Sequence, residues 1–247
     1  MKKLLFVALS FICYGAVAQT NIENKTDSLT TAVRTVSVPK TEWLPSFNKV
    51  VVDGYINVVF KQVDSEDGLK IVYDNKGNNY SRFRAVVDKN GVLQIVERAE
   101  SKQLQIPTEV TVWYKSLNDI IITQATAVFE GVIDSKLLDI TVKAGAIASM
   151  NIKSMDALVE CTGKSRLKIG GQSRYFKINI STAKMDGSEL QTVSANIDAS
   201  HEAEVRIGVS ERLEAVTSTS AKLYYKGRPT ILRNKNSLFG GEILAIE

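Results

Sequence analysis

An internal repeat in the second half of the chain constrains the fold more than any other feature of the sequence. Short runs of alternating apolar and polar residues recur with a period near 18, and corners of three to four small residues separate them. Alternation of period two buries one face of a strand and leaves the other in solvent. Two such strands per repeat predict one turn of a solenoid for each repeat.

Four units show the repeat most clearly, and each has two runs of three inward positions. The runs are Ile140, Val142, Ala144 with Ala148, Met150, Ile152; Ala157, Val159, Cys161 with Ser165, Leu167, Ile169; Ala195, Ile197, Ala199 with Ala203, Val205, Ile207; and Leu213, Ala215, Thr217 with Ala221, Leu223, Tyr225. A degenerate unit holds Phe176, Ile178 and Ile180 and slips at residues 184–187. A looser unit, with Ile120, Ile122, Val128 and Val132, precedes them all.

Stacked turns of a solenoid pair their strands in parallel, about 4.8 Å apart, so equivalent residues form columns in a close-packed interior. The repeat therefore predicts one file of Val142, Val159, Ile197 and Ala215. It predicts a second file of small residues, which are Ala148, Ser165, Ala203 and Ala221. A β-sandwich is the alternative, because sandwiches also have strands every 8–12 residues.

Residues 46–115 predict a different arrangement, with antiparallel or irregular strands packed on the solenoid. Short apolar runs alternate here with turn residues, among them Asp53-Gly54 and Asn90-Gly91. Asn-Gly between two such runs is the strongest hairpin signal in this part of the chain. The expected class is all-β, with strands in residues 46–115 and repeat coils in residues 116–247.

The first residues have the pattern of a secretory signal peptide. Two lysines precede an apolar run over residues 4–14, and Ala16-Val17-Ala18 predicts cleavage before Gln19. The run is shorter than the roughly 20 residues that span a bilayer. Cys13 raises the alternative of a lipid anchor, but the residues before it are not the small ones that such a site has. We therefore expect a signal peptide at 1–18 and a flexible lead-in at 19–45.

Charge and cysteine content narrow the class further. Cleavage would remove two lysines and no acid, and would leave 29 basic and 27 acidic residues, a net charge of +2. This balance argues against a nucleic-acid partner. No second stretch is apolar enough to cross a membrane, so we expect an exported protein of the periplasm or cell surface without a transmembrane segment. Cys161 would be the only cysteine left, which rules out an internal disulfide.

The segment from Phe47 onward resembles the putative auto-transporter adhesin, head GIN domain family of secreted bacterial proteins. The resemblance rests on VVVDGYINV at 50–58, on the small-residue corner Ala144-Gly145-Ala146, and most specifically on LYYKGRP at 223–229. Two later corners, at 199–201 and 217–219, lack the family's glycine. The resemblance implies a right-handed parallel β-helix-like fold over residues 46–247, export, and no established activity.

No set of residues predicts catalysis, a cofactor or a metal. His201 is the only histidine, and although Asp198 and Ser200 lie close to it, the repeat places it at a solvated corner. Cys161 falls in an inward column, where a cysteine behaves as a small hydrophobe. Acidic residues at 64–67 lack the glycine-aspartate repeats of calcium-binding solenoids. We therefore expect a non-enzymatic protein.

One exposed feature predicts a binding surface. Outward positions of the second strand of each unit form a basic strip tipped by an aromatic residue, interrupted by Glu204, which we call the surface strip: Arg166, Lys168, Arg206, Lys222 and Tyr224. Such a strip suits an extracellular acidic glycan or an envelope protein, although an ordinary solvated face has the same composition.

The leading functional hypothesis is an exported binding, adhesion or structural module of the cell envelope, because the long face of a solenoid suits extended ligands. Two alternatives stay open. One is a polysaccharide-acting enzyme on a β-helix scaffold, and the other is a stress-related envelope protein without a ligand.

Overall fold

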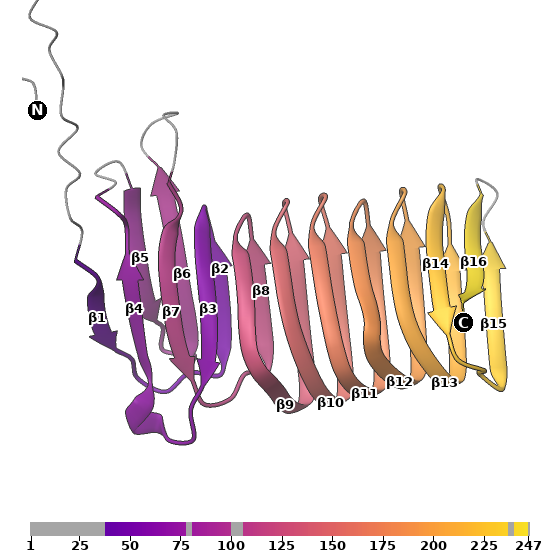
Figure 1. Cartoon of the computed structure of the whole chain (residues 1–247), viewed down its shortest axis with the longest axis horizontal. Helices are drawn as coiled ribbons and strands as arrows, with labels where there is room; N and C mark the ends of the chain where they lie inside the picture. Colours follow the sequence, from indigo (N-terminus) through magenta and orange to yellow (C-terminus); the bar gives the residue numbers. More distant parts are fainter. Residues whose placement is uncertain (1–37, 78–80, 100–105, 237–239, 247) are drawn as a thin grey trace, which may run out of the picture. The chain divides into compact units, whose positions relative to one another are not determined.

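The computed structural model describes residues 38–77, 81–99, 106–236 and 240–246, which are almost entirely β-structure. A single 3-10 turn, Glu66–Gly68, interrupts the strands (Figure 1). The strands are β1 Lys40–Trp43, β2 Lys49–Asp53, β3 Ile56–Gln62, β4 Lys70–Asp74, β5 Ser81–Val87, β6 Val92–Ala99, β7 Thr108–Tyr114, β8 Asp119–Thr123, β9 Thr126–Lys143, β10 Ile147–Thr162, β11 Arg166–Ser181, β12 Lys184–Ser200, β13 Glu204–Thr217, β14 Ala221–Lys226, β15 Ile231–Asn236 and β16 Gly241–Ile246. The predicted all-β class is confirmed.

The long strands β9 to β13 each bend in the middle and so contribute to two faces of a β-solenoid. The first parts of these strands pair in parallel with one another. The sheet that they form is extended by β3, β7, β4 and β1 at one edge and by β14 and β16 at the other. We call this sheet face I. The last parts pair in the same way. Their sheet is extended by β8, β2, β6 and β5 at one edge and by β15 at the other, and we call it face II. The predicted solenoid is thus confirmed.

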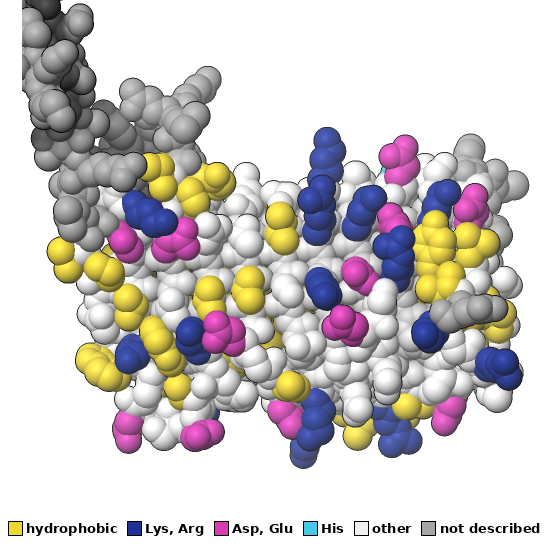
Figure 2. Space-filling model, in the orientation of Figure 1, with side chains coloured by type: hydrophobic (Ala, Val, Ile, Leu, Met, Phe, Trp, Pro, Cys, Tyr) yellow, Lys and Arg dark blue, Asp and Glu magenta, His cyan; other side chains and the backbone are white. Residues whose placement is uncertain are grey.

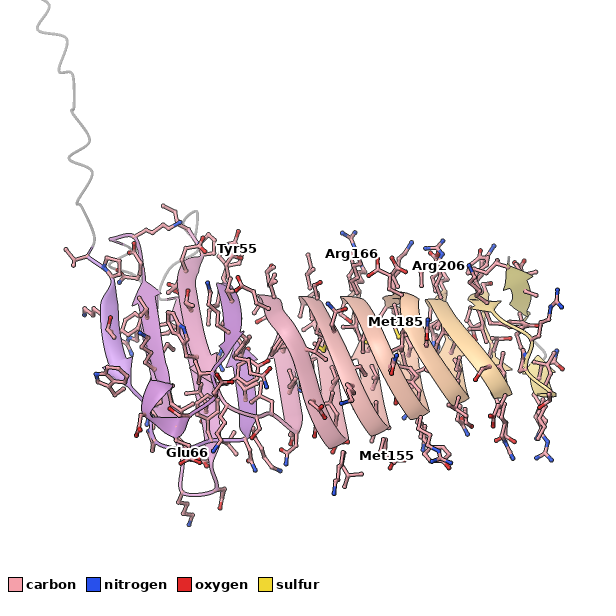
Figure 3. All side chains as sticks on the ribbon, turned by 60° about the horizontal axis from the view of Figure 1, so that its bottom comes forward. Tyr55, Glu66, Met155, Arg166, Met185 and Arg206 are labelled. Carbon is pink, nitrogen blue, oxygen red and sulfur yellow. The ribbon has the colours of Figure 1, made fainter. Side chains whose placement is uncertain are left out.

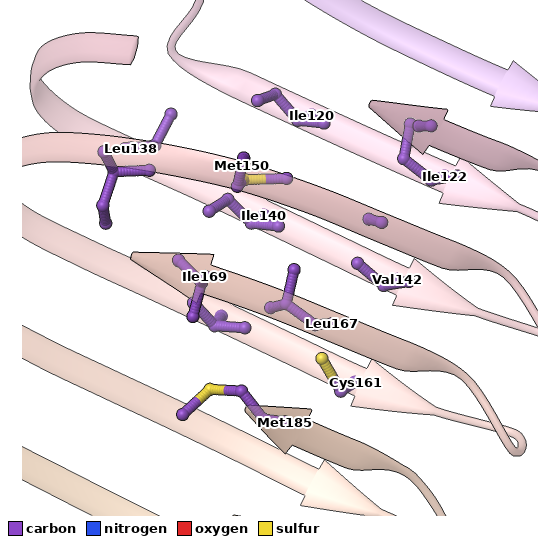
Figure 4. Close-up of a cluster of buried hydrophobic side chains, with 14 of the residues drawn as sticks. Ile120, Ile122, Leu138, Ile140, Val142, Met150, Cys161, Leu167, Ile169 and Met185 are labelled. Carbon is purple, nitrogen blue, oxygen red and sulfur yellow. The ribbon is translucent and has the colours of Figure 1, made fainter. Parts of the chain in front are cut away.

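The core lies between the two faces and is filled by inward side chains that recur from coil to coil. Figure 4 shows Met150, Leu167, Ile169 and Met185 from face I packed against Ile140, Val142 and Cys161 from face II. All seven are buried. Because each column continues through the stack, every coil buries its apolar residues against the opposite face and against the neighbouring coils.

Two-residue corners join face II to the next strand of face I. At Ala144 and Gly145 both residues have positive φ, 56° and 80°, and the Ala146 amide donates to the Lys143 carbonyl. This left-handed geometry matches the tightest hairpin turns and suits glycine. Ala144 is therefore exposed at the corner, and Ala146 takes the first inward position after it.

This corner geometry corrects the predicted register between the first two clear units. Ile140 lies beside Val159 and Leu138 beside Ala157, a spacing of 19 rather than 17 residues. Val159, Ile197 and Ala215 do share one file, with Ile178 between the first two, but Val142 lies in the next file, beside Cys161. The prediction was two residues off because it counted Ala144 as inward.

The corrected register also changes the predicted file of small residues and the predicted position of the slip. A buried small residue stands at the start of each strand from β9 to β14, and Ala146 rather than Ala148 belongs to this set: Ala125, Ala146, Ser165, Ala183, Ala203 and Ala221. Met185 lies between Leu167 and Val205, so the predicted slip begins after Gly187 instead.

The looser unit was also assigned wrongly in part. Ile120 and Ile122 are inward, as predicted, but Val128 and Val132 are 41% and 47% exposed. Phe129 and Ile133 take the buried positions there, because the alternation of β9 is offset by one residue from the prediction.

Several strands before residue 116 already belong to the parallel stack. Strand β2 pairs with β6 and β8, and β3 pairs with β7 and β9, all in parallel. Asp53-Gly54 is therefore a corner between the faces and not a hairpin. Gly54 has φ of +128°, and a Cβ there would lie 2.4 Å from the Glu97 carbonyl oxygen. The Asn90-Gly91 hairpin is confirmed, since β5 and β6 pair in antiparallel fashion around it.

The predicted signal peptide lies outside the described residues. Of the lead-in at 19–45, the structure describes residues from 38 on, and β1 there pairs in antiparallel fashion with β4. Within the described ranges, no helix is long and apolar enough to cross a membrane.

Candidate functional site

The structure places all five residues of the surface strip on face I, as the sequence predicted for their strands. Arg166 and Lys168 project from β11, Arg206 from β13, and Lys222 and Tyr224 from β14. Figure 3 shows Arg166 and Arg206 pointing away from the same side of the ribbon. In register, Arg206 lies directly beside Tyr224, and its guanidinium lies 5.3 Å from the centre of that ring.

The surface strip is not uniformly basic, because acidic side chains alternate with the basic ones across the coils. Arg206 pairs with Glu204 at 2.6 Å, Lys168 with Glu189 at 3.6 Å and Lys222 with Glu242 at 3.3 Å. Figure 2 shows basic and acidic side chains interspersed over the middle of this face. The sequence prediction noted Glu204 alone, since the partners of the other residues come from neighbouring coils.

Asp186 strengthens this mixed character. The Ser188 hydroxyl and amide donate to its carboxylate at 2.6 and 3.1 Å, and these bonds, with Arg206 and Lys168 nearby, lower the pKa of Asp186. Asp186 lies in register between Lys168 and Arg206, so a fixed negative charge stands between two residues of the surface strip.

The aromatic side chains at the other end of face I also have a cationic partner. The Lys70 ammonium lies 5.6 Å from the centre of the Trp43 ring and 4.6 Å from that of Trp113, on the neighbouring strands β1 and β7. Figure 2 shows apolar side chains gathered over these strands and over β14 and β16. Three basic residues of the surface strip thus already have an ion-pair partner, and the two tryptophans already have a cation beside their rings.

A groove along the bend of β9 to β13 offers a different environment. Its volume is about 440 Å³. One wall consists of outward side chains in register at the bend, Leu137, Asp156, Tyr175 and Ser194. The other wall lies two residues further along each strand and consists of Asp139, Leu158, Lys177, Asn196 and Glu214. We call this feature the bend groove.

A column of hydroxyl groups holds the bend in place. The Ser135 and Ser173 hydroxyls donate to the carbonyl oxygens of Leu137 and Tyr175, at 2.7 and 3.0 Å. The Ser154 hydroxyl donates to that of Ser173 at 3.0 Å, which links two coils. These bonds use carbonyl groups where the strand turns, and they fix the backbone that carries Leu137 and Tyr175.

Apolar side chains in the bend groove are open to solvent. Leu137 is 66% exposed, Tyr175 47% and Leu158 42%, although all three lie on regular strands. Apolar groups clustered in a concave surface are typical of binding sites, whereas scattered ones are ordinary.

Polar side chains in the bend groove differ from those of face I because most have no partner. Within the described part of the chain, Asp139, Asp156 and Lys177 form no ion pair, and the Asn196 amide forms no side-chain hydrogen bond. Glu214 is the exception. Hydrogen bonds from Arg212 and Arg233, at 2.6 and 3.2 Å, stabilise its carboxylate and lower its pKa.

The bend groove was not predicted from the sequence. The signal for it is the hydroxyl column, and this column becomes visible only in the corrected register.

The residues that sequence analysis set aside as non-catalytic lie apart from the bend groove. Cys161 is fully buried, and its burial, with Glu160 nearby, raises its pKa to about 12. His201 is exposed at a corner with φ of 53°, and its Nδ1 lies 3.1 and 3.2 Å from the hydroxyls of Ser200 and Ser181. In the described ranges, no three histidine, cysteine or acidic side chains gather as metal ligands would.

Solved structures share this fold. A putative adhesin from Bacteroides fragilis has a TM-score of 0.78 at 16% identity, over 86% of this chain and 98% of that one. A putative adhesin from Parabacteroides merdae has 0.64 at 14%, over 85% and 96%. A structure from Parabacteroides distasonis, described as a putative lipid binding protein, has 0.60 at 13%, over 85% and 97%. At these identities the likeness shows the fold alone.

The sequence comparisons settle the family. None of the curated proteins matches the chain. The profile of the family described as "Putative auto-transporter adhesin, head GIN domain" matches residues 46–229, which is most of the chain. The names of this family and of its structural neighbours suggest a binding role rather than an enzymatic one. The chain therefore belongs to the putative auto-transporter adhesin, head GIN domain family.

Proposed function

We propose that this protein is an exported, non-catalytic binding or adhesion module of the cell envelope that holds its ligand in the bend groove. The observation that carries the proposal is the groove itself. It crosses five strands and combines exposed Leu137, Leu158 and Tyr175 with polar side chains that have no partner in the described residues. Apolar side chains gathered in a concave surface, beside polar groups without partners, support a ligand-binding role for the groove.

The surface strip is a second proposed binding surface, for an acidic glycan or an envelope protein. Its carboxylates weaken the attraction for a polyanion, and its ion pairs would have to open to make new contacts. The bend groove is favoured over the surface strip because its polar groups need no such exchange.

Export is part of the same proposal. The N-terminal pattern supports it, and so does membership of a family named for adhesins. Expression of the whole chain in a Gram-negative host should yield a periplasmic or surface protein whose N-terminal residue is Gln19. Recovery of the uncleaved chain from the cytoplasm would contradict this part of the proposal.

A binding experiment with two matched double variants tests the bend groove. The chain from Gln19 onward would be incubated with immobilised bacterial envelope fractions and polysaccharides, and the bound fraction measured. Leu137→Ser with Leu158→Ser should lower the affinity about tenfold or more, since each change removes an apolar contact. Val128→Ser with Val132→Ser, two exposed apolar residues of β9 that lie outside the bend groove, should leave binding unchanged. Equal binding by both variants would contradict the proposal.

The same assay distinguishes a binding module from an enzyme, and the bend groove from the surface strip. An enzyme would release new reducing or unsaturated ends from the polysaccharides, whereas a binding module only retains them. Substitution of Arg166, Lys168 and Arg206 by Ser should matter only if the surface strip is the binding surface. Loss of binding in that variant, with full binding in the groove variant, would assign the function to face I.

A further inference from the structure

Tyr175 gives the bend groove a feature that identifies its ligand more closely. The ring is 47% exposed, and the Arg174 guanidinium lies 5.5 Å from its centre. Nearly half of the residue therefore remains accessible to a ligand even with the guanidinium beside the ring. The hydroxyl column fixes the backbone of Tyr175 through the bond from Ser173 at 3.0 Å, which sets the point from which the side chain projects.

The polar groups around Tyr175 offer both kinds of hydrogen bond. Asp156 and Ser194 flank it in register, and Lys177 and Asn196 lie on the opposite wall. The carboxylate of Asp156 accepts, the ammonium of Lys177 donates, and the amide of Asn196 does both. A ligand that matches this set carries many groups that can each donate and accept, as hydroxyl groups do.

The charges of the bend groove favour a ligand without net charge. Asp139 and Asp156 are matched in number by Lys177 and by Arg174 beside Tyr175, and Arg212 and Arg233 already neutralise Glu214. An acidic chain would meet as many carboxylates as cations, so the bend groove offers it no net attraction. An acyl chain would cover the aspartates and the lysine without supplying any hydrogen bond, which is costly for a charged group.

The length of the bend groove suits a chain and not a single small molecule. It crosses five parallel strands, which are about 4.8 Å apart, so it extends for roughly 19 Å. A sugar ring has an apolar C–H face for stacking on an aromatic ring, and hydroxyl groups around its edge. Successive rings of an oligosaccharide can therefore meet successive coils.

On these grounds we infer that the bend groove binds a chain of neutral sugars. One ring stacks on Tyr175, and its hydroxyl groups exchange hydrogen bonds with Asp156, Lys177 and Asn196. The inference rests on the proposed function and names the ligand class for the same site.

Affinity electrophoresis and calorimetry of the chain from Gln19 onward test this inference. The probes are hexasaccharides of β-linked glucose, of mannose and of N-acetylglucosamine, with hexagalacturonate and dodecanoate as the acidic and acyl alternatives. At least one neutral hexasaccharide should bind, and Tyr175→Ala should weaken it about tenfold. Tyr55→Ala is the matched control, because Tyr55 is also an exposed tyrosine but lies outside both the bend groove and the surface strip, and it should bind normally. Equal thermal midpoints would show that both variants are folded.

Each other outcome overturns the inference in a distinguishable way. If no neutral hexasaccharide binds, but Leu137→Ser with Leu158→Ser still weakens binding to the envelope fractions, the sugar assignment is wrong and the groove proposal stands. The same conclusion holds if only hexagalacturonate or only dodecanoate binds. If Tyr175→Ala binds a neutral hexasaccharide as tightly as Tyr55→Ala does, both the assignment and the groove proposal fail.

Discussion

At the scale of single residues, the corners show how backbone conformation and side-chain choice interact. Several corner residues have positive φ without being glycine, among them Ala144, His201 and Thr219. A left-handed conformation costs a residue with a Cβ about 1–2 kcal/mol, and a β-branched residue fits it poorly. The stack tolerates this because each corner also bonds to the next, as the Glu202 amide does to the Thr219 carbonyl at 2.9 Å.

The corners predict opposite effects for two substitutions. Thr219→Gly should raise the free energy of unfolding by about 0.5–1 kcal/mol, because φ of 49° no longer strains the backbone. Gly145→Ala should lower it by about 1 kcal/mol, although a Cβ there would meet nothing within 4 Å. Urea unfolding followed by circular dichroism measures both. A stabilised Gly145→Ala variant would show that the left-handed geometry is not imposed.

Cys161 gives a residue-scale prediction that depends on burial alone. Its pKa of about 12 leaves almost no thiolate at pH 8, and its side chain is inaccessible. The chain from Gln19 onward, which lacks Cys13, should not react with a disulfide reagent at pH 8 until it is unfolded in guanidinium. Rapid modification of the folded protein, measured by absorbance, would contradict the buried position.

At the scale of elements, the bend in each long strand depends on hydroxyl groups as much as on apolar packing. Ser173 is almost completely buried, donates to the Tyr175 carbonyl and accepts from Ser154. Thr192 continues the column in the next coil and donates to the Gly208 carbonyl at 2.7 Å. A buried hydroxyl is unfavourable unless it is bonded, so this column is positioned by its partners.

Ser173→Ala should therefore destabilise the protein more than its size suggests. The change leaves the Ser154 hydroxyl without its acceptor and the Tyr175 carbonyl without its donor, which should cost about 1–2 kcal/mol. Ser149→Ala is a fitting control, since Ser149 is half-buried on face I and no side-chain hydrogen bond holds it in the described structure. Equal unfolding midpoints for the two variants would show that the hydroxyl column contributes nothing.

At the scale of the whole molecule, the register of the coils is the property that the sequence revealed least accurately. Alternation alone identified the inward residues of β10, β11 and β13, such as Val159, Ile169 and Val205. It could not count the residues in a corner, because Ala144 is small enough to be read as either inward or exposed. A register error of two residues preserves the inside and outside of every strand, so nothing in the alternation exposes it.

The two proposed binding surfaces were predictable to different degrees for the same reason. Which strand carries Arg166 or Lys222 can be deduced from one strand at a time, so the surface strip could be found. Which residue lies beside Tyr175 depends on three coils in correct register, so the bend groove could not. The ion partners of the surface strip, such as Glu242 for Lys222, were missed because they come from another coil.

A deletion of one coil tests the register of the stack. Ile147 lies beside Arg166, so removal of residues 147–165 takes out 19 residues and rejoins the chain at an equivalent position. We expect the shortened protein to fold, with a β-type circular dichroism spectrum and a single unfolding transition. Removal of residues 147–164 takes out 18 and reverses inside and outside in the strand after the junction, so it should yield insoluble or unfolded protein. Equal solubility of the two deletions would contradict the assigned register.

The bend groove is built from the same two positions of successive strands, from β9 to β12, with Glu214 of β13 at its end. The extent of the binding surface is therefore proportional to the number of coils, and gain or loss of a 19-residue unit changes it by one step of about 4.8 Å. Duplication of such a unit would lengthen the footprint on a polymer without redesigning any contact. Family members with different coil numbers should then differ in the shortest ligand fragment that they retain.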